Sequence, residues 1–305
     1  MSTNRYGIYA VQRGATLVGG IMSESIDLGS QIVADSSSGE VYPRWVSLVG
    51  QRPNAKFTSK HIGTCIGVSG TMGNYLTTGN VMNLYLQRWA EGITRASGNA
   101  HRKVTVNKGL LLPTRLSGRS GSDATMSCDV AALYDGTNSP LTILDNQALP
   151  APSTADERYV FHKATIAGQT FDSDMGCDID FGITPVIETV RSEVWPRWGS
   201  VAGQTATITI TAEDIEALAD ARIPMGGVAT THVNTILYFR RRLNGSTFAA
   251  DSSGTHMTIT AAGMASITNA FDGSNQSPGG MAVQVTCVFD GTNAPLLVST
   301  SANIA

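Results

Sequence analysis

The feature that most constrains the fold of this chain is a repeat that runs through most of its sequence. Tyr42–Gln51 (YPRWVSLVGQ) and Trp195–Gln204 (WPRWGSVAGQ) match at six of ten positions and lie 153 residues apart. One such match arises by chance about once in a chain of ordinary composition. Duplication is therefore indicated only if other segments share the offset.

Other segments do correspond, at 153 in the earlier part and at 155 near the end. The corresponding pairs are Ile26–Gly29 with Ile179–Gly182, Leu84–Leu86 with Leu237–Phe239, His101 with His256, and Tyr134–Leu141 (YDGTNSPL) with Phe289–Leu296 (FDGTNAPL). The change in offset places a two-residue insertion between about Gly245 and His256. A nearly constant offset indicates tandem duplication, and we call the two halves copy one and copy two.

The composition between the copies predicts a short, stiff connector. Pro150–Arg158 (PAPSTADER) combines two prolines with small and charged residues. We therefore expect one domain at 5–149, a linker at 150–158 and a second domain at 159–305.

Each copy has the pattern of a β-rich domain. Thr205–Thr211 alternates polar and apolar residues with a period of two, which is typical of a half-buried strand. Val81–Arg88 and Val233–Arg240 are equivalent β-rich runs. The apolar runs before Asp135 and Asp290 lead into Asp-Gly turns. These patterns predict a mainly β protein with two tandem β-sandwich or barrel domains.

One short flanking α-helix is also expected in each copy. In copy two, Thr211–Asp214 can form a capping box, Ile215, Leu218 and Ala219 share one face, and Pro224 ends the helix. This helix has a weaker counterpart in copy one.

In copy one, Thr58 is the expected helix cap, and Ile62, Cys65 and Ile66 fall on the equivalent apolar face. Two glycines inside this segment would each cost about 1 kcal/mol relative to alanine. Cys65 is therefore expected to serve as a packing residue, since its counterpart is a leucine.

Composition and charge limit the classes of partner. The chain is 42% hydrophobic but only 15% charged. A surface largely covered by a partner would explain the low charge, and so would a β protein rich in Thr and Ser. The net charge of -3 gives no reason to expect a nucleic-acid binder, since phosphate contacts come from clustered Lys and Arg.

No targeting or membrane segment is expected. Met1–Ala10 has no apolar core of a signal peptide, and no stretch approaches the roughly 20 apolar residues of a membrane span. The four cysteines have no metal-binding spacing, which predicts thiols in a reducing cytoplasm.

No combination of residues predicts catalysis, a cofactor or a metal. Gly67–Gly73 is glycine-rich but lacks the lysine of a phosphate loop. The acidic run Phe171–Asp180 is expected to be a solvated strand face rather than a calcium loop. For His101 and His256, the only histidines that recur, a shared structural hydrogen bond is favoured over a ligand role. Arg240–Arg242 favours salt bridging between subunits at a strand end over contact with a polyanion.

The repeated Pro-Arg-Trp motif carries no catalytic group. Proline fixes the chain, tryptophan offers a large surface for packing, and arginine can reach a carboxylate or stack on a ring. Its recurrence predicts a docking element that is used twice around a symmetric assembly.

The layout of both copies resembles a known family. An Ile-Asp-x-Gly strand, one flanking helix, a β-sandwich body and a late strand ending in Phe289–Pro295 (FDGTNAP) are similar to the tube domain of long-tailed bacteriophage tail tube proteins. The resemblance implies sheets joined side by side in rings, which stack into a tube around the tape-measure protein. A duplicated member would form pseudo-six-fold rings of about three chains.

The expected function is therefore that of a structural virion protein, not an enzyme. Its expected partners are itself, the tape-measure protein and other tail proteins, with DNA only as passing cargo and no membrane. The protein would be assembled in the bacterial host cytoplasm and located in the virion tail. The alternatives are another virion component, such as a baseplate hub or capsid decoration protein, or a tandem β-sandwich carbohydrate-binding or adhesin module.

Overall fold

The structure is a computed structural model, and it describes residues 5–36, 38–90, 94–152, 157–171, 176–190, 193–212, 232–245, 247–274 and 277–304. The protein is mainly β, with 64% of residues in strands and one short helix within the described ranges. The expected mainly β class is confirmed. The helix expected in copy two falls on 213–231, outside the described residues, and Thr211, its expected cap, lies in a strand.

The elements of copy one follow one another closely along the chain. They are β1 (Arg5–Arg13), β2 (Thr16–Val18), β3 (Ile21–Asp27), β4 (Ser30–Asp35), β5 (Trp45–Gln51), β6 (Asn54–Ser59), α1 (Ile62–Ser69), β7 (Asn74–Leu76), β8 (Met82–Trp89), β9 (His101–Val106), β10 (Gly109–Arg119), β11 (Ser122–Ala132) and β12 (Leu141–Gln147).

The described elements of copy two appear in a corresponding order. They are β13 (Arg158–Ile166), β14 (Gln169–Phe171), β15 (Gly176–Asp180), β16 (Ile183–Thr189), β17 (Pro196–Gln204), β18 (Thr207–Ala212), β19 (Val233–Arg242), β20 (His256–Ser274), β21 (Ser277–Cys287) and β22 (Leu297–Ala302). The strands expected around Thr205–Thr211, Val81–Arg88 and Val233–Arg240 are confirmed as β18, β8 and β19.

Strand pairing in copy two repeats that in copy one. In copy one, β1 pairs with β2 and β8, β8 with β9, β9 with β12, β10 with β11, β11 with β6, and β6 with β3. In copy two, β13 pairs with β14 and β19, β20 with β19, β22 and β21, β21 with β18, and β18 with β15. The register of pairing also repeats. Arg5 of β1 lies opposite Trp89 of β8, and their counterparts at the repeat offset, Arg158 of β13 and Arg242 of β19, also lie opposite each other.

The copies differ in one connection. The first part of β20 corresponds to β9 and its second part to β10, which Asn107 and Lys108 separate in copy one. Because β20 is continuous over 19 residues, the strands of copy two other than β16 and β17 lie in one sheet, which also contains β10, β11, β6, β3 and β7 of copy one. Strands of copy one also form a separate five-stranded sheet in the order β12-β9-β8-β1-β2, while β4–β5 and β16–β17 each form a two-stranded sheet.

The core extends across both copies. Alternate residues of β11, including Met126, Cys128 and Val130, are buried, as are Val283 and Val285 in the equivalent strand β21. Buried side chains from both copies belong to a single hydrophobic cluster. All four cysteines are buried and unpaired, as expected for thiols that serve as small apolar residues.

Helix α1 packs as expected but is capped differently. Ile62, Cys65 and Ile66 are buried, yet Thr58, the expected cap, lies in β6. Glu157 fills the capping role instead: the backbone N–H and the hydroxyl of Thr64 both donate to its carboxylate, at 2.9 and 2.8 Å. The sequence did not indicate this cap because Glu157 belongs to the linker region, far along the chain.

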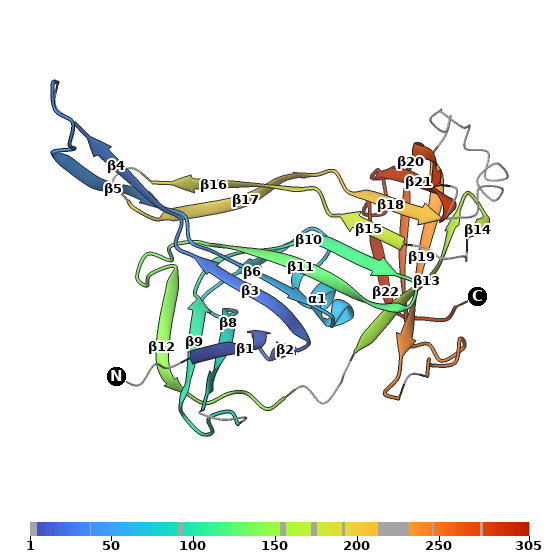
Figure 1. The fold of residues 1–305 in the computed structure, drawn as a ribbon, viewed down its shortest axis with the longest axis horizontal. Helices are drawn as coiled ribbons and strands as arrows, with labels where there is room; N and C mark the ends of the chain where they lie inside the picture. Colours follow the sequence, from blue (N-terminus) through green and yellow to red (C-terminus); the bar gives the residue numbers. More distant parts are fainter. Residues whose placement is uncertain are drawn as a thin grey trace.

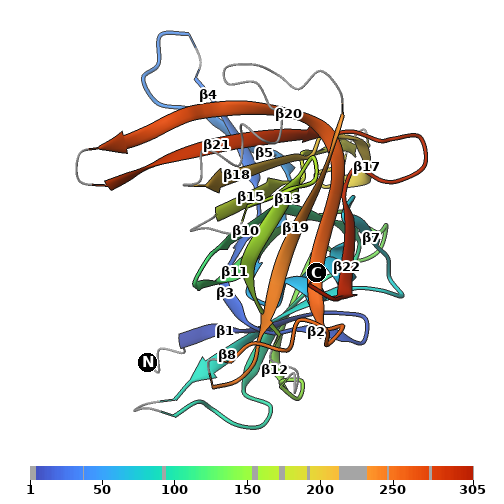
Figure 2. The same ribbon diagram turned by 90° about the vertical axis from the view of Figure 1, so that its right-hand side faces the viewer.

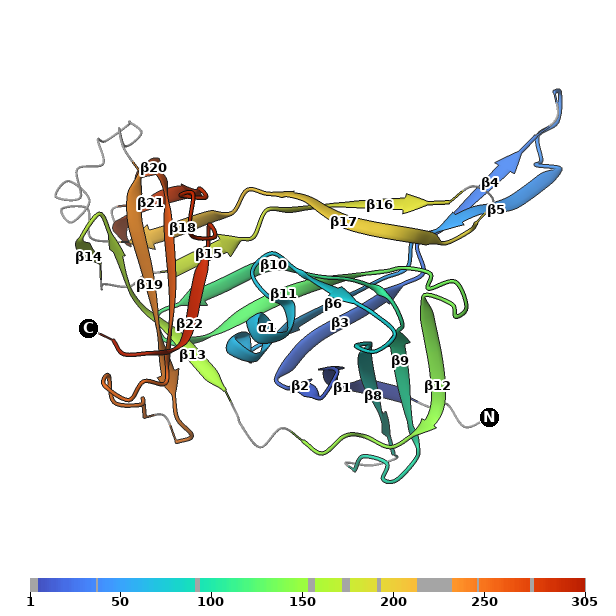
Figure 3. The same cartoon turned by 180° about the vertical axis from the view of Figure 1, so that it is seen from behind.

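Two β-hairpins extend along one side of the molecule. We call β4–β5 the first arm and β16–β17 the second arm. Figures 1 and 3 show the second arm lying over the sheet of copy one, while the first arm projects beyond the body, away from copy two. Figure 2 shows the distal part of the β20–β21 hairpin extending past β18 and β15.

Candidate assembly interface

The two copies join edge to edge within the chain, through β10 of copy one and β15 of copy two. These strands pair antiparallel from Arg115 opposite Asp180 to Arg119 opposite Gly176. The Arg115 guanidinium lies 2.9 Å from the Asp178 carboxylate, across the joint. We call this joint the internal seam.

The internal seam is closely packed. A Cβ at Gly118 would lie 2.8 Å from the ring of Phe239 and 3.1 Å from the Cβ of Phe161. The two phenylalanine rings pack with their centroids 5.4 Å apart. A residue without a side chain therefore lets copy two approach β10 at this point.

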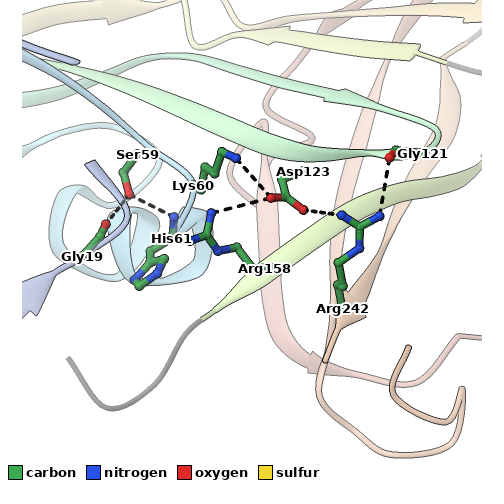
Figure 4. A network of polar contacts seen from close by, with 8 residues as sticks. All are labelled: Gly19, Ser59, Lys60, His61, Gly121, Asp123, Arg158 and Arg242. Atoms are coloured by element: carbon green, nitrogen blue, oxygen red, sulfur yellow. Dashed lines mark hydrogen bonds and ion pairs between the residues drawn. The ribbon is translucent and has the colours of Figure 1, made fainter. Parts of the chain in front are cut away.

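A charge network beside the seam joins β6, β11, β13 and β19 (Figure 4). Asp123 is central, with a carboxylate 3.2 Å from Lys60 Nζ, 3.6 Å from Arg158 and 2.9 Å from Arg242. Asp123 is also the residue of β11 that pairs with Val160 of β13. One carboxylate of copy one therefore holds two guanidinium groups of copy two.

Among the described residues, the strand edges equivalent to those of the internal seam have no strand partner. β3 corresponds to β15 and pairs only with β6 in these ranges. The Met264–Ser274 part of β20 corresponds to β10, and its pairing in the same ranges is with β21 alone. The internal seam joins a β10-type edge to a β15-type edge. In the described residues, one further edge of each type is unpaired: the second part of β20 is the β10-type edge, and β3 is the β15-type edge.

A carboxylate on the unpaired β3 edge lacks partners. Both Glu24 carboxylate oxygens are buried, and neither has a hydrogen-bond partner within the described residues. Burial raises the pKa of Glu24 to about 7. Its counterpart in copy two is Cys177, a buried thiol in the internal seam. Glu24 therefore places a carboxylate where copy two has an apolar core residue, while four of the seven residues of β3 are exposed.

The second arm docks on copy one through its Pro-Arg-Trp segment. The Tyr134 amide donates to the Pro196 carbonyl at 2.7 Å, and the rings of Tyr134 and Trp195 lie 5.4 Å apart. Trp195 Nε1 donates to Gln51 at 2.7 Å, and Lys108 donates to the Arg197 carbonyl at 2.8 Å. The segment thus packs on copy one within the chain, through Trp195 and Pro196, while Trp198, the tryptophan of the motif, is 50% exposed. Use of the motif twice around a symmetric assembly stays a prediction.

The Pro-Arg-Trp segment of the first arm makes no such contact among the described residues, and the arm exposes many apolar side chains. The largest exposures are those of Val41, at 88%, and Tyr42, at 81%. The other exposed apolar residues of this arm are Ile32, Val33, Trp45, Val46, Leu48 and Val49. Apolar patches of this kind mark surfaces that a partner covers.

The residues singled out for possible chemistry have structural roles. His101 Nδ1 accepts from the Arg88 amide and His256 Nδ1 from the Arg241 amide, both at 3.1 Å, as the favoured structural bond predicts. The Asp135 carboxylate accepts from the amides of Thr137 and Asn138 in a turn, at 2.7 and 2.6 Å, and Asp290 does the same in copy two.

The charged runs make ion pairs within the chain. Arg240 pairs with Asp251 at 3.0 Å and Arg242 with Asp123 at 2.9 Å, while salt bridging between subunits stays a prediction. In the acidic run, Asp178 contacts Arg115 and Asp180 accepts from the Gly182 amide. Asp172 and Asp174 lie outside the described residues.

Across the ranges that the structure describes, no group of three or more His, Cys, Asp or Glu side chains is placed to hold a metal ion. In the same ranges, no helix combines the length and apolar character of a membrane span. The chain matches no family model, and no curated protein matches its sequence.

Proposed function

We propose that the protein is a structural subunit that assembles head to tail with copies of itself, and that the assembly is the ring of a phage tail tube. The observation that carries the proposal is the internal seam. One chain joins β15 to β10, while the equivalent edges, β3 and the second part of β20, have no strand partner in the part of the chain that the structure describes.

The joint between chains would repeat the register of the internal seam. Arg115 pairs with Asp180, and Ser117 with Asp178. At the repeat offsets, Ala270 would lie opposite Asp27 of the next chain, and Asp272 opposite Ser25. Such pairing satisfies the unpaired N–H and C=O groups of two exposed edges, which otherwise template aggregation.

This contact is heterologous, because each chain offers two different edges. A heterologous contact generates a ring if its rotation closes and an open filament if it does not. Both tandem copies, each proposed to be a β-sandwich, would occupy equivalent positions in a closed ring. The resemblance to tail tube proteins favours closure with about three chains per ring.

The tail tube role agrees with the chemistry of the chain. A lumen that conducts DNA avoids dense Lys and Arg, which would retain the phosphate backbone, and the net charge here is -3. The proposed location is the virion tail, with the tape-measure protein inside the tube.

The test combines microscopy with a cross-link across the proposed joint. Negative-stain images of the purified protein should show rings or tubes. Antiparallel partners have Cα atoms close enough for a disulfide, so a chain carrying Ser25→Cys and Asp272→Cys should form a ladder of covalent oligomers under oxidation. The Ser25→Cys chain alone is the control and should form no ladder. A strictly monomeric protein at high concentration would refute the proposal.

A further inference from the structure

We propose that the first arm of each chain docks on copy two of the neighbouring chain, with Tyr42 packed against Phe289. This inference rests on the head-to-tail assembly proposed above and identifies its second contact. The occupant of the exposed arm is therefore another copy of this chain.

The docked second arm provides the template for this contact. Its Trp195 packs against Tyr134, and its Pro196 carbonyl accepts from the Tyr134 amide. At the repeat offsets, the equivalents of these residues are Tyr42, Pro43 and Phe289. The corresponding joint would place the Tyr42 ring on Phe289 and the Pro43 carbonyl at the Phe289 amide.

The residues of this second joint are exposed in the single chain. Tyr42 is 81% exposed and Phe289 is 63% exposed, whereas Trp195 and Tyr134 shield each other and are half-buried. The first arm extends away from copy two of its own chain, so it does not reach Phe289 within the chain (Figures 1 and 3). Only a neighbouring chain can bring the two rings together.

Side-chain sizes on the two surfaces change in a compensating way. In the internal joint the second arm has Gly199, where a Cβ would lie 3.0 Å from Leu133 and 3.2 Å from Leu110. The equivalent position of the first arm is Val46, and the residues facing it would be Val288 and Ala265 in place of the two leucines.

A larger side chain on the first arm therefore meets smaller ones on copy two. Protein interiors and interface cores are close-packed, so a contact that adds methyl groups on one side must lose volume on the other. This compensation is expected only if Val46 contacts the copy-two surface, as Gly199 contacts the copy-one surface.

The charged residue of the motif is already oriented in the undocked arm. Arg197 pairs with Glu193 at 2.9 Å and lies over the Tyr134 ring, 5.9 Å from its centroid. Arg44 forms the equivalent ion pair with Glu40 in the undocked first arm. The first arm thus presents the same preorganised guanidinium, which would lie over Phe289 in the neighbour.

The experiment uses co-expressed full-length chains, one carrying Tyr42→Cys and the other Phe289→Cys, treated with a short bismaleimide. A covalent dimer of the two chains is expected, because the native cysteines are buried. As a positive control, a chain with Tyr134→Cys and Trp195→Cys should cross-link within itself. Tyr42→Ala should raise the protein concentration at half-assembly about tenfold or more, whereas Tyr75→Ala, an exposed aromatic on β7, should change it less than about twofold.

The outcomes separate the arm contact from the assembly itself. If the Ser25→Cys, Asp272→Cys ladder forms but the Tyr42–Phe289 cross-link does not, the arm proposal is overturned and the ring proposal stands. If two Tyr42→Cys chains cross-link to each other but not to the Phe289→Cys chain, the first arms contact each other, and the arm proposal is also overturned. A chain that stays monomeric in all experiments overturns both.

Discussion

Removing the Asp123 carboxylate should loosen the joint between the two copies. Asp123 is only 15% exposed and contacts Lys60, Arg158 and Arg242 at 3.2, 3.6 and 2.9 Å. Asp123→Asn keeps the shape of the side chain but leaves three cations without their shared counter-charge. Because Asp123 belongs to copy one and the two arginines belong to copy two, the substitution removes ion pairs between the copies.

The magnitude follows from the burial of the partners. An exposed ion pair contributes about 0.2–1 kcal/mol, while removing one partner of a fully buried pair costs about 3–5 kcal/mol. The free energy contributed by the Asp123 ion pairs should lie between these limits, because the side chains of its partners are 26–32% exposed. We expect Asp123→Asn to lower the free energy of unfolding by about 2–3 kcal/mol.

Urea denaturation at a fixed protein concentration measures this loss, which corresponds to a midpoint shift of about 1 M. The matched control is Asp145→Asn, since Asp145 pairs with Arg102 at 2.6 Å but is 56% exposed. The control should cost less than about 1 kcal/mol. Amide hydrogen exchange should localise the effect of Asp123→Asn to β11, β13 and β19.

The reasoning would be refuted if Asp123→Asn and Asp145→Asn had equal effects. It would also be refuted if hydrogen exchange increased first in β8, β9 and β12, which contain no member of the Asp123 network. Either result would mean that packing at Gly118 and the β10–β15 ladder hold the copies together without the charges.

Further predictions concern Glu24 and two glycines. Because burial raises the pKa of Glu24 from 4.5 to about 7, the folded protein keeps a proton that the unfolded chain loses, and stability falls as pH rises through this window. Glu24→Gln should therefore raise the free energy of unfolding at pH 8 by on the order of 2 kcal/mol but not at pH 4; an equal gain at both values would contradict this cause. Gly118→Ala should cost about 1–3 kcal/mol by overpacking against Phe239 and Phe161. Gly67 lies on helix α1, where an added Cβ would meet nothing within 4 Å, so Gly67→Ala should raise the free energy of unfolding by up to about 1 kcal/mol. Thermal denaturation should therefore show a lower melting temperature for Gly118→Ala and a higher one for Gly67→Ala.

Periodicity and the repeat offset were sufficient to predict the mainly β class and the positions of several strands, including β8, β18 and β19. The alternation of Thr205–Thr211 depends only on local sequence, and β18 has this pattern of burial. The Asp-Gly turns were predictable for the same reason, since the Asp135 and Asp290 carboxylates bond amides two and three residues away.

Contacts between the copies were not predictable from either copy alone. Thr58 matched the local cap pattern, yet helix α1 is capped by Glu157, 93 residues from Thr64. Asp123 gave no sequence signal, because its three partners are dispersed along the chain. The sequence shows that Gly199, Leu110 and Leu133 correspond to Val46, Ala265 and Val288, but only the structure shows that Gly199 lies against the two leucines, so the proposed arm contact could not be inferred before it.

The Asp123 network distinguishes the internal seam from the proposed joint between chains. At the repeat offsets, Pro278 replaces Asp123 and Trp89 replaces Arg242, so the joint between chains has no equivalent charge network. The internal seam forms between segments of one chain, at a high effective concentration, and therefore closes first. The joint between chains would then form between prefolded subunits, through backbone pairing and the first arm. A weaker joint, without an equivalent of the Asp123 network, is suited to this second step, because misplaced subunits can dissociate before a ring closes.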